Sequence, residues 1–410
     1  MNCRHCATPL DPTRDIFVDL GTAPPSNAFL RESDLDCAEA YLPLKVFTCG
    51  NCRLVQVDEI ERRDALFSSD YVYFSSFSST WLAHAEAYVD KAVERLTLSS
   101  KSFVVEVASN DGYLLQYVQQ RGIPCVGIEP TASTAQAARA RGIESIEQFF
   151  GERFATELSV KRGRADLIIG NNVLAHVPDI NDFVAGLRCA LAPGGTVSVE
   201  FPHLLQLVQH GQFDTVYHEH FSYLSLHAVQ RVFEAQGLIV WDVEELSTHG
   251  GSLRVWAQPK AGPRAVLASV ECMLQMEAAA GMLTDAFYHT LQQRAEGIKN
   301  DLLAFLIDAK REGKRVMGYG AAAKGNTLMN FAGIRSDLIT SVADASPHKQ
   351  GRFLPGSRLP VVAPSSIDEI KPDYIVIFPW NIRAEVEAQL APARAWGAKF
   401  VTAVPELRVA

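Results

Sequence analysis

A dense set of proton-handling side chains occupies the segment VYHEHFSYLS, residues 216–225. Histidine titrates near neutral pH, a carboxylate can orient a histidine or hold a substrate, and a tyrosine hydroxyl can donate to developing negative charge. The segment contains no lysine or arginine that would make it a simple charged surface run. We expect acid–base chemistry from its members, Tyr217, His218, Glu219, His220 and Tyr223.

Two other interpretations of this segment stay open on the sequence alone. In the first, it is a polar loop before a helix, with Ser222 or Ser225 as the N-cap. In the second, it binds a metal, although His-Glu-His lacks the i and i+4 histidine spacing of zinc hydrolases.

Four cysteines near the N-terminus fall into two Cys-x-x-Cys pairs, CRHC and CGNC. Each short spacing brings two sulfurs toward one ion, and four thiolates suit a tetrahedral zinc. The alternative is a redox-active pair, which does not require a second pair with the same spacing. A four-thiolate site has no open coordination position, so we expect a structural role. The predicted zinc ligands are Cys3, Cys6, Cys49 and Cys52. The remaining cysteines are expected to be small core residues, namely Cys37, Cys125, Cys189 and Cys272.

The segment FVVEVASNDGYLLQYV, residues 103–118, has the pattern of an apolar strand, a turn of small residues and a helix. Such a turn at the carboxyl end of a first strand forms a ligand site in α/β folds. Glu106 lies at the end of this strand, and Glu129 ends the next one, where a carboxylate can hold both hydroxyls of a ribose. The dinucleotide fingerprint would need glycines where Ala108 and Asn110 stand, so a pyrophosphate is not the expected ligand.

The composition is that of a folded protein with several cores. A chain of 410 residues suits two or three domains, and 48% hydrophobic with 21% charged residues is typical of globular proteins. The net charge of −9 argues against a function that coats nucleic acid or anionic lipid. The sequence begins without the apolar stretch of a signal peptide, and no run of about 18 apolar residues occurs. We therefore expect a cytoplasmic protein with neither a nucleic-acid nor a membrane partner.

Three units are predicted along the chain, and the fold class is α/β. Residues 1–75 are turn-rich and strand-like and form a small β-rich zinc-binding domain. In residues 76–262, an amphipathic helix over 79–98 precedes apolar strands that alternate with helices, which predicts a Rossmann-like parallel sheet. Residues 263–410 are predicted to form a helical linker and another small α/β domain.

Several segments together resemble a known enzyme family. The strand–turn–helix with its acidic residue resembles motif I of the S-adenosylmethionine methyltransferases. ADLIIGNNVLAHVPD resembles their fourth strand and following loop, and LAPGGTVSVEFP their next turn. With the cysteine pairs, YHEHFSYLS and GYGAAAKGNT, the whole chain resembles the sugar C-methyltransferases, which methylate a nucleotide-linked keto-deoxysugar. The resemblance implies S-adenosylmethionine and a structural zinc as cofactors and a nucleotide-linked keto-sugar as substrate.

The resemblance also implies which residues contact the cofactor. Glu106 and Asn110 are expected near its methionine part, with Ala108 in the turn between them, and Glu129 is expected to hold the adenosine ribose. The strand end formed by Asn171 and Asn172 is expected to face the amino-acid part of the cofactor.

Methylation of a carbon next to a ketone requires a base beside that carbon and a donor beside the carbonyl oxygen. The resemblance assigns the base to His220, with Tyr217 and Glu219 beside it and His176 reaching the same cavity. In the implied mechanism His220 removes the proton, Tyr217 or His176 steadies the enolate oxygen, and the carbanion attacks the sulfonium methyl. Tyr71 matches an aromatic residue that the N-terminal unit offers to the sugar, although Tyr73 could hold that role instead.

The segment RVMGYGAAAKGNTLMN, residues 315–330, predicts a strand, a glycine turn and a helix start, where backbone amides favour phosphate. It is not a Walker loop, because Lys324 precedes Gly325. The resemblance implies that residues 263–410 contain a second Rossmann-like domain that helps hold the nucleotide part of the sugar. Lys324 and Asn326 are the expected substrate-binding residues, with Thr327 as a helper. The alternative is a structural turn with a solvated lysine.

Two competing functions remain on the sequence. An O- or N-methyltransferase acting on a related small substrate would need a base but no enolate stabiliser. A non-catalytic, zinc-bearing protein that binds nucleotide sugars is opposed by the cofactor signature of Glu106 and Glu129.

Overall fold

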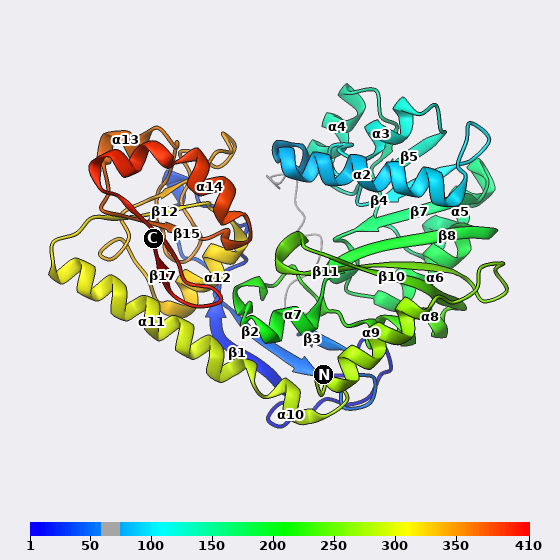
Figure 1. Ribbon diagram of the computed structural model, residues 1–410, viewed down its shortest axis with the longest axis horizontal. Coiled ribbons are helices and arrows are strands. Elements are labelled where there is room, and N and C mark those ends of the chain that lie inside the picture. The colour runs from blue at the N-terminus through cyan, green and yellow to red at the C-terminus, as the bar shows by residue number, and fades with distance from the viewer. Residues whose placement is uncertain (59–73) are drawn as a thin grey trace.

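The computed structural model describes residues 1–58 and 74–410 and arranges them around three β-sheets (Figure 1). Two larger units that mix helices with mostly parallel strands lie side by side, and a small antiparallel sheet lies below and between them (Figure 1). The predicted α/β class with a small β-rich N-terminal part is confirmed. No helix in these ranges has the length and apolar character that crossing a membrane requires.

The small sheet takes its last strand from a distant part of the chain. Its strands are, in spatial order, β1 (Ile16–Ala23), β2 (Leu42–Thr48), β3 (Val55–Val57) and β9 (Ser222–Tyr223). β3 and β9 pair through Val55 with Tyr223 and through Gln56 with Ser222. The N-terminal unit therefore holds the backbone that directly follows His220.

The central sheet positions the turn of residues 108–114, named the cofactor turn because the sequence predicts that it contacts the cofactor. Its strands are, in spatial order, β10 (Leu238–Leu246), β11 (Ser252–Pro259), β8 (Leu191–Pro202), β7 (Ala165–Asn171), β4 (Val104–Val107), β5 (Cys125–Ile128) and β6 (Ser145–Ile146). β11 is antiparallel to both of its neighbours, and the strands from β8 to β6 are parallel. The chain leaves β4 toward β5 and later returns on the other side as β7. Ligands bind at the carboxyl ends of strands where the order reverses in this way.

Helices cover both faces of the central sheet, as its strands, buried on both faces, require. They are α2 (Ser79–Leu96), α3 (Leu115–Gln120), α4 (Ala132–Ala140), α5 (Glu152–Arg162), α6 (Ile180–Ala190) and α8 (Leu226–Ala235). α7 (Leu204–Gln209) instead packs in the core that the small sheet shares with the C-terminal unit. α2 and α3 pack on one face, whereas α5, α6 and α8 pack on the other. α2 starts at the predicted residue, because the Ser78 hydroxyl caps it by accepting from the Trp81 amide at 3.2 Å.

The predicted helical linker consists of three helices, α9 (Ala268–Ala279), α10 (Asp285–Tyr288) and α11 (Leu291–Arg311). α9 buries Val270 and Met273 in the core of the central unit. α11 buries Leu302 and Leu306 in a core shared by the small sheet and the C-terminal unit. The linker therefore packs on all three sheets rather than spanning solvent.

The C-terminal unit is a second parallel sheet with its own reversal of strand order. Its strands are, in spatial order, β14 (Val361–Val362), β13 (Val342–Ala343), β12 (Val316–Tyr319), β15 (Tyr374–Ile377), β16 (Lys399–Thr402) and β17 (Arg408–Val409). Its helices are α12 (Ala323–Ala332), α13 (Ser366–Ile370) and α14 (Arg383–Gln389). Only β17 is antiparallel to its neighbour. The order reverses between β12 and β15, so the segments after these strands face the same crevice.

Candidate active site and zinc centre

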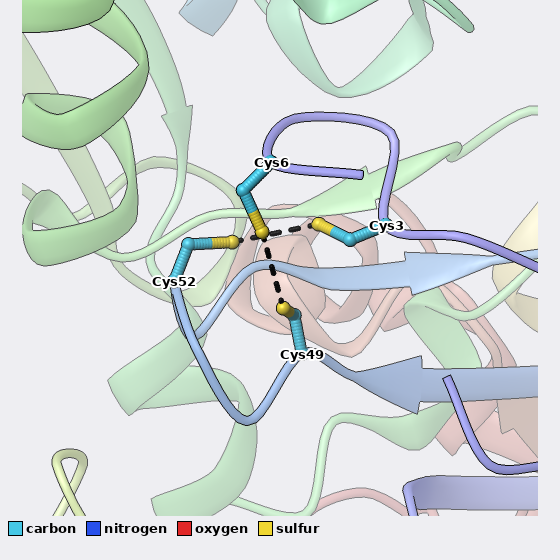
Figure 2. Close-up of side chains that lie close together, drawn as sticks. All are labelled: Cys3, Cys6, Cys49 and Cys52. Carbon is cyan, nitrogen blue, oxygen red and sulfur yellow. Dashed lines mark hydrogen bonds between the residues drawn. The ribbon is translucent and has the colours of Figure 1, made fainter. Parts of the chain in front are cut away.

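The two Cys-x-x-Cys pairs meet in space (Figure 2). The sulfurs of Cys3 and Cys52 lie 3.5 Å apart, as do those of Cys6 and Cys49, and all four lie within 4.8 Å of one another. A tetrahedral zinc with bonds of about 2.3 Å needs sulfurs roughly 3.8 Å apart. The four thiols therefore fit the predicted ion.

Both pairs form the same backbone turn. The residue after each second cysteine is left-handed, with φ of 58° at Ala7 and 61° at Arg53. The Ala7 amide donates to the Cys3 carbonyl at 2.9 Å, and the Arg53 amide donates to the Cys49 carbonyl at 2.9 Å. The two turns thus direct their sulfurs inward through backbone hydrogen bonds that do not depend on the side chains.

The expectation that the other cysteines are core residues is wrong for Cys37 and Cys272, whereas Cys125 and Cys189 pack against the edges of the apolar cores. Cys37 and Cys272 are exposed, and Cys125 and Cys189 are half-buried. Cys272 faces solvent because α9 turns Val270 and Met273 toward the sheet, which leaves the position between them outside.

The first cysteine pair also docks onto the central unit through the residues between its cysteines. The Arg4 guanidinium donates to the Pro178 carbonyl at 2.7 Å and lies 5.4 Å from the centre of the Phe221 ring. The His5 ring donates to the Asn181 side-chain oxygen at 2.8 Å. The zinc centre therefore supports the residue next to His220 from outside the central unit.

The cofactor turn has a glycine-like backbone with few glycines. Ala108, Asn110 and Gly112 have φ angles of 57°, 49° and 78°. Asparagine tolerates this left-handed region, but an alanine there costs about 1–2 kcal/mol. The turn is therefore tight even though it lacks the glycine fingerprint.

Two buried carboxyl groups flank this turn. Glu129 accepts hydrogen bonds from the backbone amides of Asn110 and Thr131, both at 2.9 Å. Burial raises the pKa of Glu129 despite these bonds. Burial and the nearby Glu129 charge raise the pKa of Glu106 well above its ordinary value. The cofactor turn and the following strand are therefore tied together through Glu129.

The end of β7 carries polar side chains whose hydrogen bonds a ligand could complete. Asn171 is 7% exposed, and neither its side-chain oxygen nor its nitrogen has a hydrogen-bond partner among the described residues. A buried polar group without a partner costs about 1–3 kcal/mol, unless a ligand satisfies it. Asn172, with φ of 53°, donates from its side chain to His249 Nε2 at 3.3 Å. These amides fit the polar amino-acid part of the expected cofactor.

His220 has the tautomer that a general base requires. Its Nδ1 donates to the Thr215 carbonyl at 2.9 Å, because a carbonyl oxygen can only accept. The lone pair of the neutral ring is therefore on Nε2. Burial lowers the pKa of His220 well below its ordinary value, and the neighbouring His176 and Lys324 add to this shift. The ring is neutral and ready to accept a proton at pH 7.

Other predicted catalytic residues surround His220. The Tyr217 and His176 ring centres lie 4.0 Å and 4.6 Å from the His220 ring centre. His176 Nδ1 donates to the Glu219 carbonyl at 2.8 Å, and burial lowers the pKa of His176 to about 4. These three side chains therefore form one cluster, in which His220 is buried and Tyr217 and His176 are half-buried.

Glu219 and His218 turn toward the N-terminal unit. The Glu219 carboxylate accepts from the Asn27 side chain at 3.2 Å, and burial raises its pKa. His218 Nε2 donates to the Pro43 carbonyl at 3.2 Å. Orientation of the His220 ring comes from a backbone carbonyl, that of Thr215, rather than from the Glu219 carboxylate.

The open interpretations of this segment find partial support. Ser225 does cap α8, because its hydroxyl accepts from the Ala228 amide at 3.1 Å. Within residues 1–58 and 74–410, the group of side chains placed to bind a metal consists of the four clustered cysteines and includes no histidine.

Tyr71 and Tyr73 lie outside the described residues.

The predicted substrate-binding residues lie in the first turn of α12. Lys324 donates to the Asn381 side chain at 2.9 Å and lies 4.5 Å from the centre of the Trp380 ring. Burial lowers the pKa of Lys324 to about 8, and the Asp214 charge opposes that shift. Asn326 donates from its amide nitrogen to the Ser26 carbonyl at 2.6 Å, and this hydrogen bond connects α12 to the N-terminal unit.

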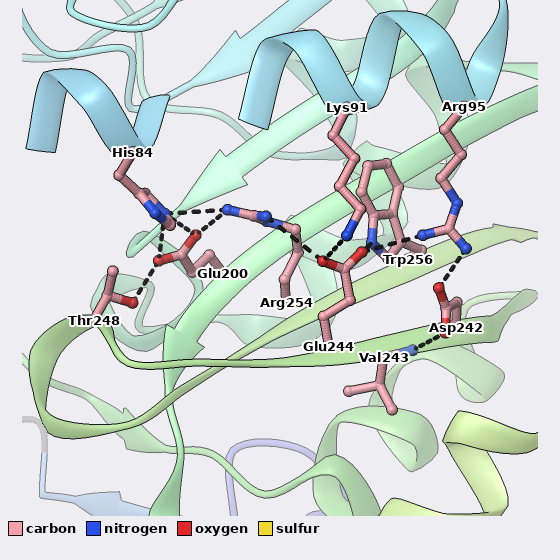
Figure 3. A network of polar contacts seen from close by, with 10 residues as sticks. All are labelled: His84, Lys91, Arg95, Glu200, Asp242, Val243, Glu244, Thr248, Arg254 and Trp256. Carbon is pink, nitrogen blue, oxygen red and sulfur yellow. Dashed lines mark hydrogen bonds and ion pairs between the residues drawn. The ribbon is translucent and has the colours of Figure 1, made fainter. Parts of the chain in front are cut away.

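Sequence analysis missed a buried polar network beside the cofactor turn (Figure 3). His84 Nε2 lies 2.9 Å and 3.1 Å from the two carboxylate oxygens of Glu200, and Arg254 donates to Glu200 at 2.7 Å. Burial alone would raise the pKa of Glu200, but the His84 hydrogen bond and the Arg254 charge lower it overall. The His84 ring stacks on Trp81, with ring centres 4.9 Å apart, and Trp81 stacks on Tyr113 of the turn.

His249 was also missed, although the two glycines that follow it in THGG are a local signal. It has a left-handed φ of 54°, which is unusual for a residue other than glycine. Burial lowers its pKa to about 4, with the Lys324 charge as the next cause. Strained residues of this kind gather at functional sites.

Comparison with known proteins decides the family. Over 407 residues the chain is 34% identical to C-methyltransferase NovU of Streptomyces niveus, covering 99% of this chain and 96% of that protein. The chain belongs to the C-methyltransferase family. Three family models match successive parts of this C-methyltransferase. They are "Putative zinc binding domain" over residues 3–67, "Methyltransferase domain" over 81–243 and "C-methyltransferase C-terminal domain" over 247–405. The predicted zinc site and the predicted S-adenosylmethionine-dependent methyltransferase fold are confirmed.

Solved structures resemble part of this C-methyltransferase. The PH0226 protein of Pyrococcus horikoshii OT3 is 16% identical with a TM-score of 0.37, covering 46% of this chain and 95% of that chain. The magnesium protoporphyrin IX methyltransferase of Synechocystis PCC 6803, solved with bound S-adenosylmethionine, is 15% identical with a TM-score of 0.33. That match covers 43% of this chain and 80% of the other. The family assignment rests on the full-length relative.

Proposed function

We propose that this C-methyltransferase adds a methyl group to a nucleotide-linked keto-deoxysugar, at the carbon next to the ketone. The observation that carries the proposal is the neutral, buried His220, whose Nδ1 is committed to the Thr215 carbonyl and whose Nε2 holds the lone pair. Carbon methylation next to a ketone needs such a base, because the substrate carbon must first lose a weakly acidic proton.

Bound S-adenosylmethionine supplies the electrophilic methyl group. His220 Nε2 receives the proton from the substrate carbon. Its low pKa keeps the ring unprotonated at neutral pH but makes it a weak base, so the developing enolate oxygen needs its own stabilisation. The site must therefore contain a hydrogen-bond donor close to the base.

Of the two donors expected from the sequence, Tyr217 fits this role better than His176. His176 donates its Nδ1–H to the Glu219 carbonyl, so the other nitrogen of the neutral ring is an acceptor. The pKa of about 4 keeps this ring neutral at pH 7. Tyr217 carries a hydroxyl and lies against His220. We infer that Tyr217 stabilises the enolate oxygen and that His176 shapes the cavity and holds the loop.

The C-terminal unit is proposed to bind the nucleotide part of the sugar through Lys324 and Asn326. The location of Lys324 after β12, where the strand order reverses, supports this. The division at residues 75 and 262 into zinc-binding, methyltransferase and nucleotide-binding domains belongs to the same proposal, as do the cytoplasmic location and a role in deoxysugar biosynthesis.

A product analysis tests the proposal. Purified protein is incubated with S-adenosylmethionine and a panel of nucleotide-linked keto-sugars, and carbon NMR locates the new methyl group. We expect a carbon–carbon bond next to the ketone. A methyl group on oxygen or nitrogen would contradict the proposal, as would the absence of product from every keto-sugar when other small substrates are methylated.

A further inference from the structure

The Thr215 carbonyl, which accepts from His220 Nδ1 and so sets the tautomer of His220, belongs to a short 3₁₀ helix. Thr215 ends η4 (Phe213–Thr215), a single turn of 3₁₀ helix. A single turn of this kind has few hydrogen bonds of its own and depends on its surroundings for stability. The surroundings of Thr215 therefore decide how firmly its carbonyl faces His220 Nδ1.

Two side chains of the C-terminal unit bind the residues on either side of Thr215. The Trp380 indole N–H donates to the Asp214 carboxylate at 2.7 Å. The Thr327 hydroxyl donates to the Val216 carbonyl at 2.8 Å. Thr327 and Asp214 are only 2% and 1% exposed, so water does not replace either bond readily. η4 is thus held from outside by bonds to the residues immediately before and after Thr215.

The indole of Trp380 is itself fixed by the central unit. A Cβ atom at Gly250, where φ is +89°, would lie 2.4 Å from the Trp380 ring, so only glycine permits this close approach. The Gln212 side chain donates to the Gly250 carbonyl at 2.8 Å and joins this loop to the start of η4. The Lys324 ammonium lies 4.5 Å from the same indole ring.

We propose that Trp380 and Thr327 are positioning residues for the base: they hold η4 so that the Thr215 carbonyl keeps His220 in the tautomer with the lone pair on Nε2. The inference rests on the proposed function, in which His220 removes the proton. It also links the proposed nucleotide site to the base. Trp380 contacts Lys324, the residue proposed to meet the nucleotide, and the same indole binds the loop that sets the base.

The test compares matched variants of the full-length protein. Trp380→Phe keeps the ring but removes the indole N–H, and Thr327→Val keeps the shape but removes the hydroxyl. Two controls remove equivalent bonds inside the C-terminal unit: Trp396→Phe loses a bond to the Pro372 carbonyl, and Thr340→Val loses one to the Val316 carbonyl.

The direct readout is nitrogen NMR of protein labelled with ¹⁵N-histidine, with the His220 signals assigned by their loss in His220→Asn. The wild type and both controls should show a protonated Nδ1 and an unprotonated Nε2. The double variant Trp380→Phe, Thr327→Val should show a mixture of tautomers. With a substrate that the enzyme methylates, the double variant should have a kcat roughly tenfold to a hundredfold lower than the wild type, while KM changes by less than about threefold. The reason is that the substitutions misalign the base without removing a substrate contact.

A second pair of variants guards against a general loss of structure. Asp214→Asn keeps an oxygen that accepts from the indole and should behave like the wild type. Asp214→Ala removes the acceptor and should behave like Trp380→Phe. An unchanged His220 tautomer in both the double variant and Asp214→Ala would overturn the inference, as would a wild-type ring protonated on Nε2. A shifted tautomer without any effect on proton removal from substrate would uphold the positioning and refute His220 as the base.

Discussion

The backbone amide of Asn110 donates to the Glu129 carboxylate at 2.9 Å, which joins the cofactor turn after β4 to the end of β5. A carboxylate in this place can hold the turn and still offer its remaining lone pairs to ribose hydroxyls. Glu129 therefore holds the shape of the site, and the same residue is proposed to bind the ligand.

Glu129→Ala should weaken S-adenosylmethionine binding by about 1–3 kcal/mol, because hydrogen bonds to a charged acceptor are lost. Titration calorimetry measures the affinity, and Glu129→Gln, which keeps one acceptor oxygen, should lose less. Unaltered affinity in Glu129→Ala would remove this residue from the cofactor site.

Ala108→Gly should stabilise the cofactor-free protein. The left-handed backbone at φ 57° is strained for alanine and free of strain for glycine, and the flexibility of glycine in the unfolded chain offsets part of the gain. The expected net effect is about 0.5–1 kcal/mol in favour of the variant. Denaturant unfolding measures it, with Ala87→Gly on the exposed face of α2 as a control that should instead lose stability. A loss in Ala108→Gly as large as in the control would show that the turn is not strained.

Cys49→Ser should lower the zinc content and the melting temperature together, because a closed tetrahedral site loses one of its four thiolates. Turnover should fall as well, since the Arg4 side chain between the first cysteines contacts the loop at Pro178 and the ring of Phe221. Metal analysis and thermal melting check the first part. The control is Cys37→Ser, which changes an exposed cysteine outside the cluster. Full zinc content in Cys49→Ser would rule out the site.

The cofactor turn, the zinc ligands and helix α2 were predictable because each depends on a short stretch of sequence. Two Cys-x-x-Cys spacings and an apolar strand before small residues carry their own local signals. The support of His220 was not predictable in this way. Its acceptor is the backbone carbonyl of Thr215, an atom that every residue type possesses.

Long-range pairing accounts for the rest. The pairing of β3 with β9 joins residue 56 to residue 222, and the bond from Trp380 to Asp214 crosses between two units. Neither contact produces a local sequence pattern from which it could be predicted. The exposure of Cys272 depends on which face of α9 meets the sheet, and that face is set by the neighbouring β10. The roles of the individual site residues, Tyr71 among them, stay predictions.

Acid should destabilise the wild type through His176. The folded-state pKa of about 4 lies below the ordinary 6.5, so the unfolded chain binds more protons in this window, and the free energy of unfolding falls as pH falls from 6.5 to 4. His176→Asn lacks this group. The difference in the free energy of unfolding between the wild type and His176→Asn should therefore shrink by roughly 3 kcal/mol as pH falls from 6.5 to 4. Denaturant unfolding at several pH values measures the difference, and a deficit independent of pH would contradict a His176 that stays neutral in the folded protein.

Exchange of the substrate proton with solvent tests most directly whether His220 is the base. A nucleotide-linked keto-sugar that the enzyme methylates is incubated in deuterated water with S-adenosylhomocysteine, which cannot donate a methyl group, and proton NMR follows the position next to the ketone. The wild type should incorporate deuterium there, whereas His220→Asn should exchange at least about 100-fold more slowly, the usual scale for a general base. Melting temperature and cofactor affinity should be the same in both proteins. Equal exchange rates in the wild type and His220→Asn would contradict the account and assign proton removal to another group.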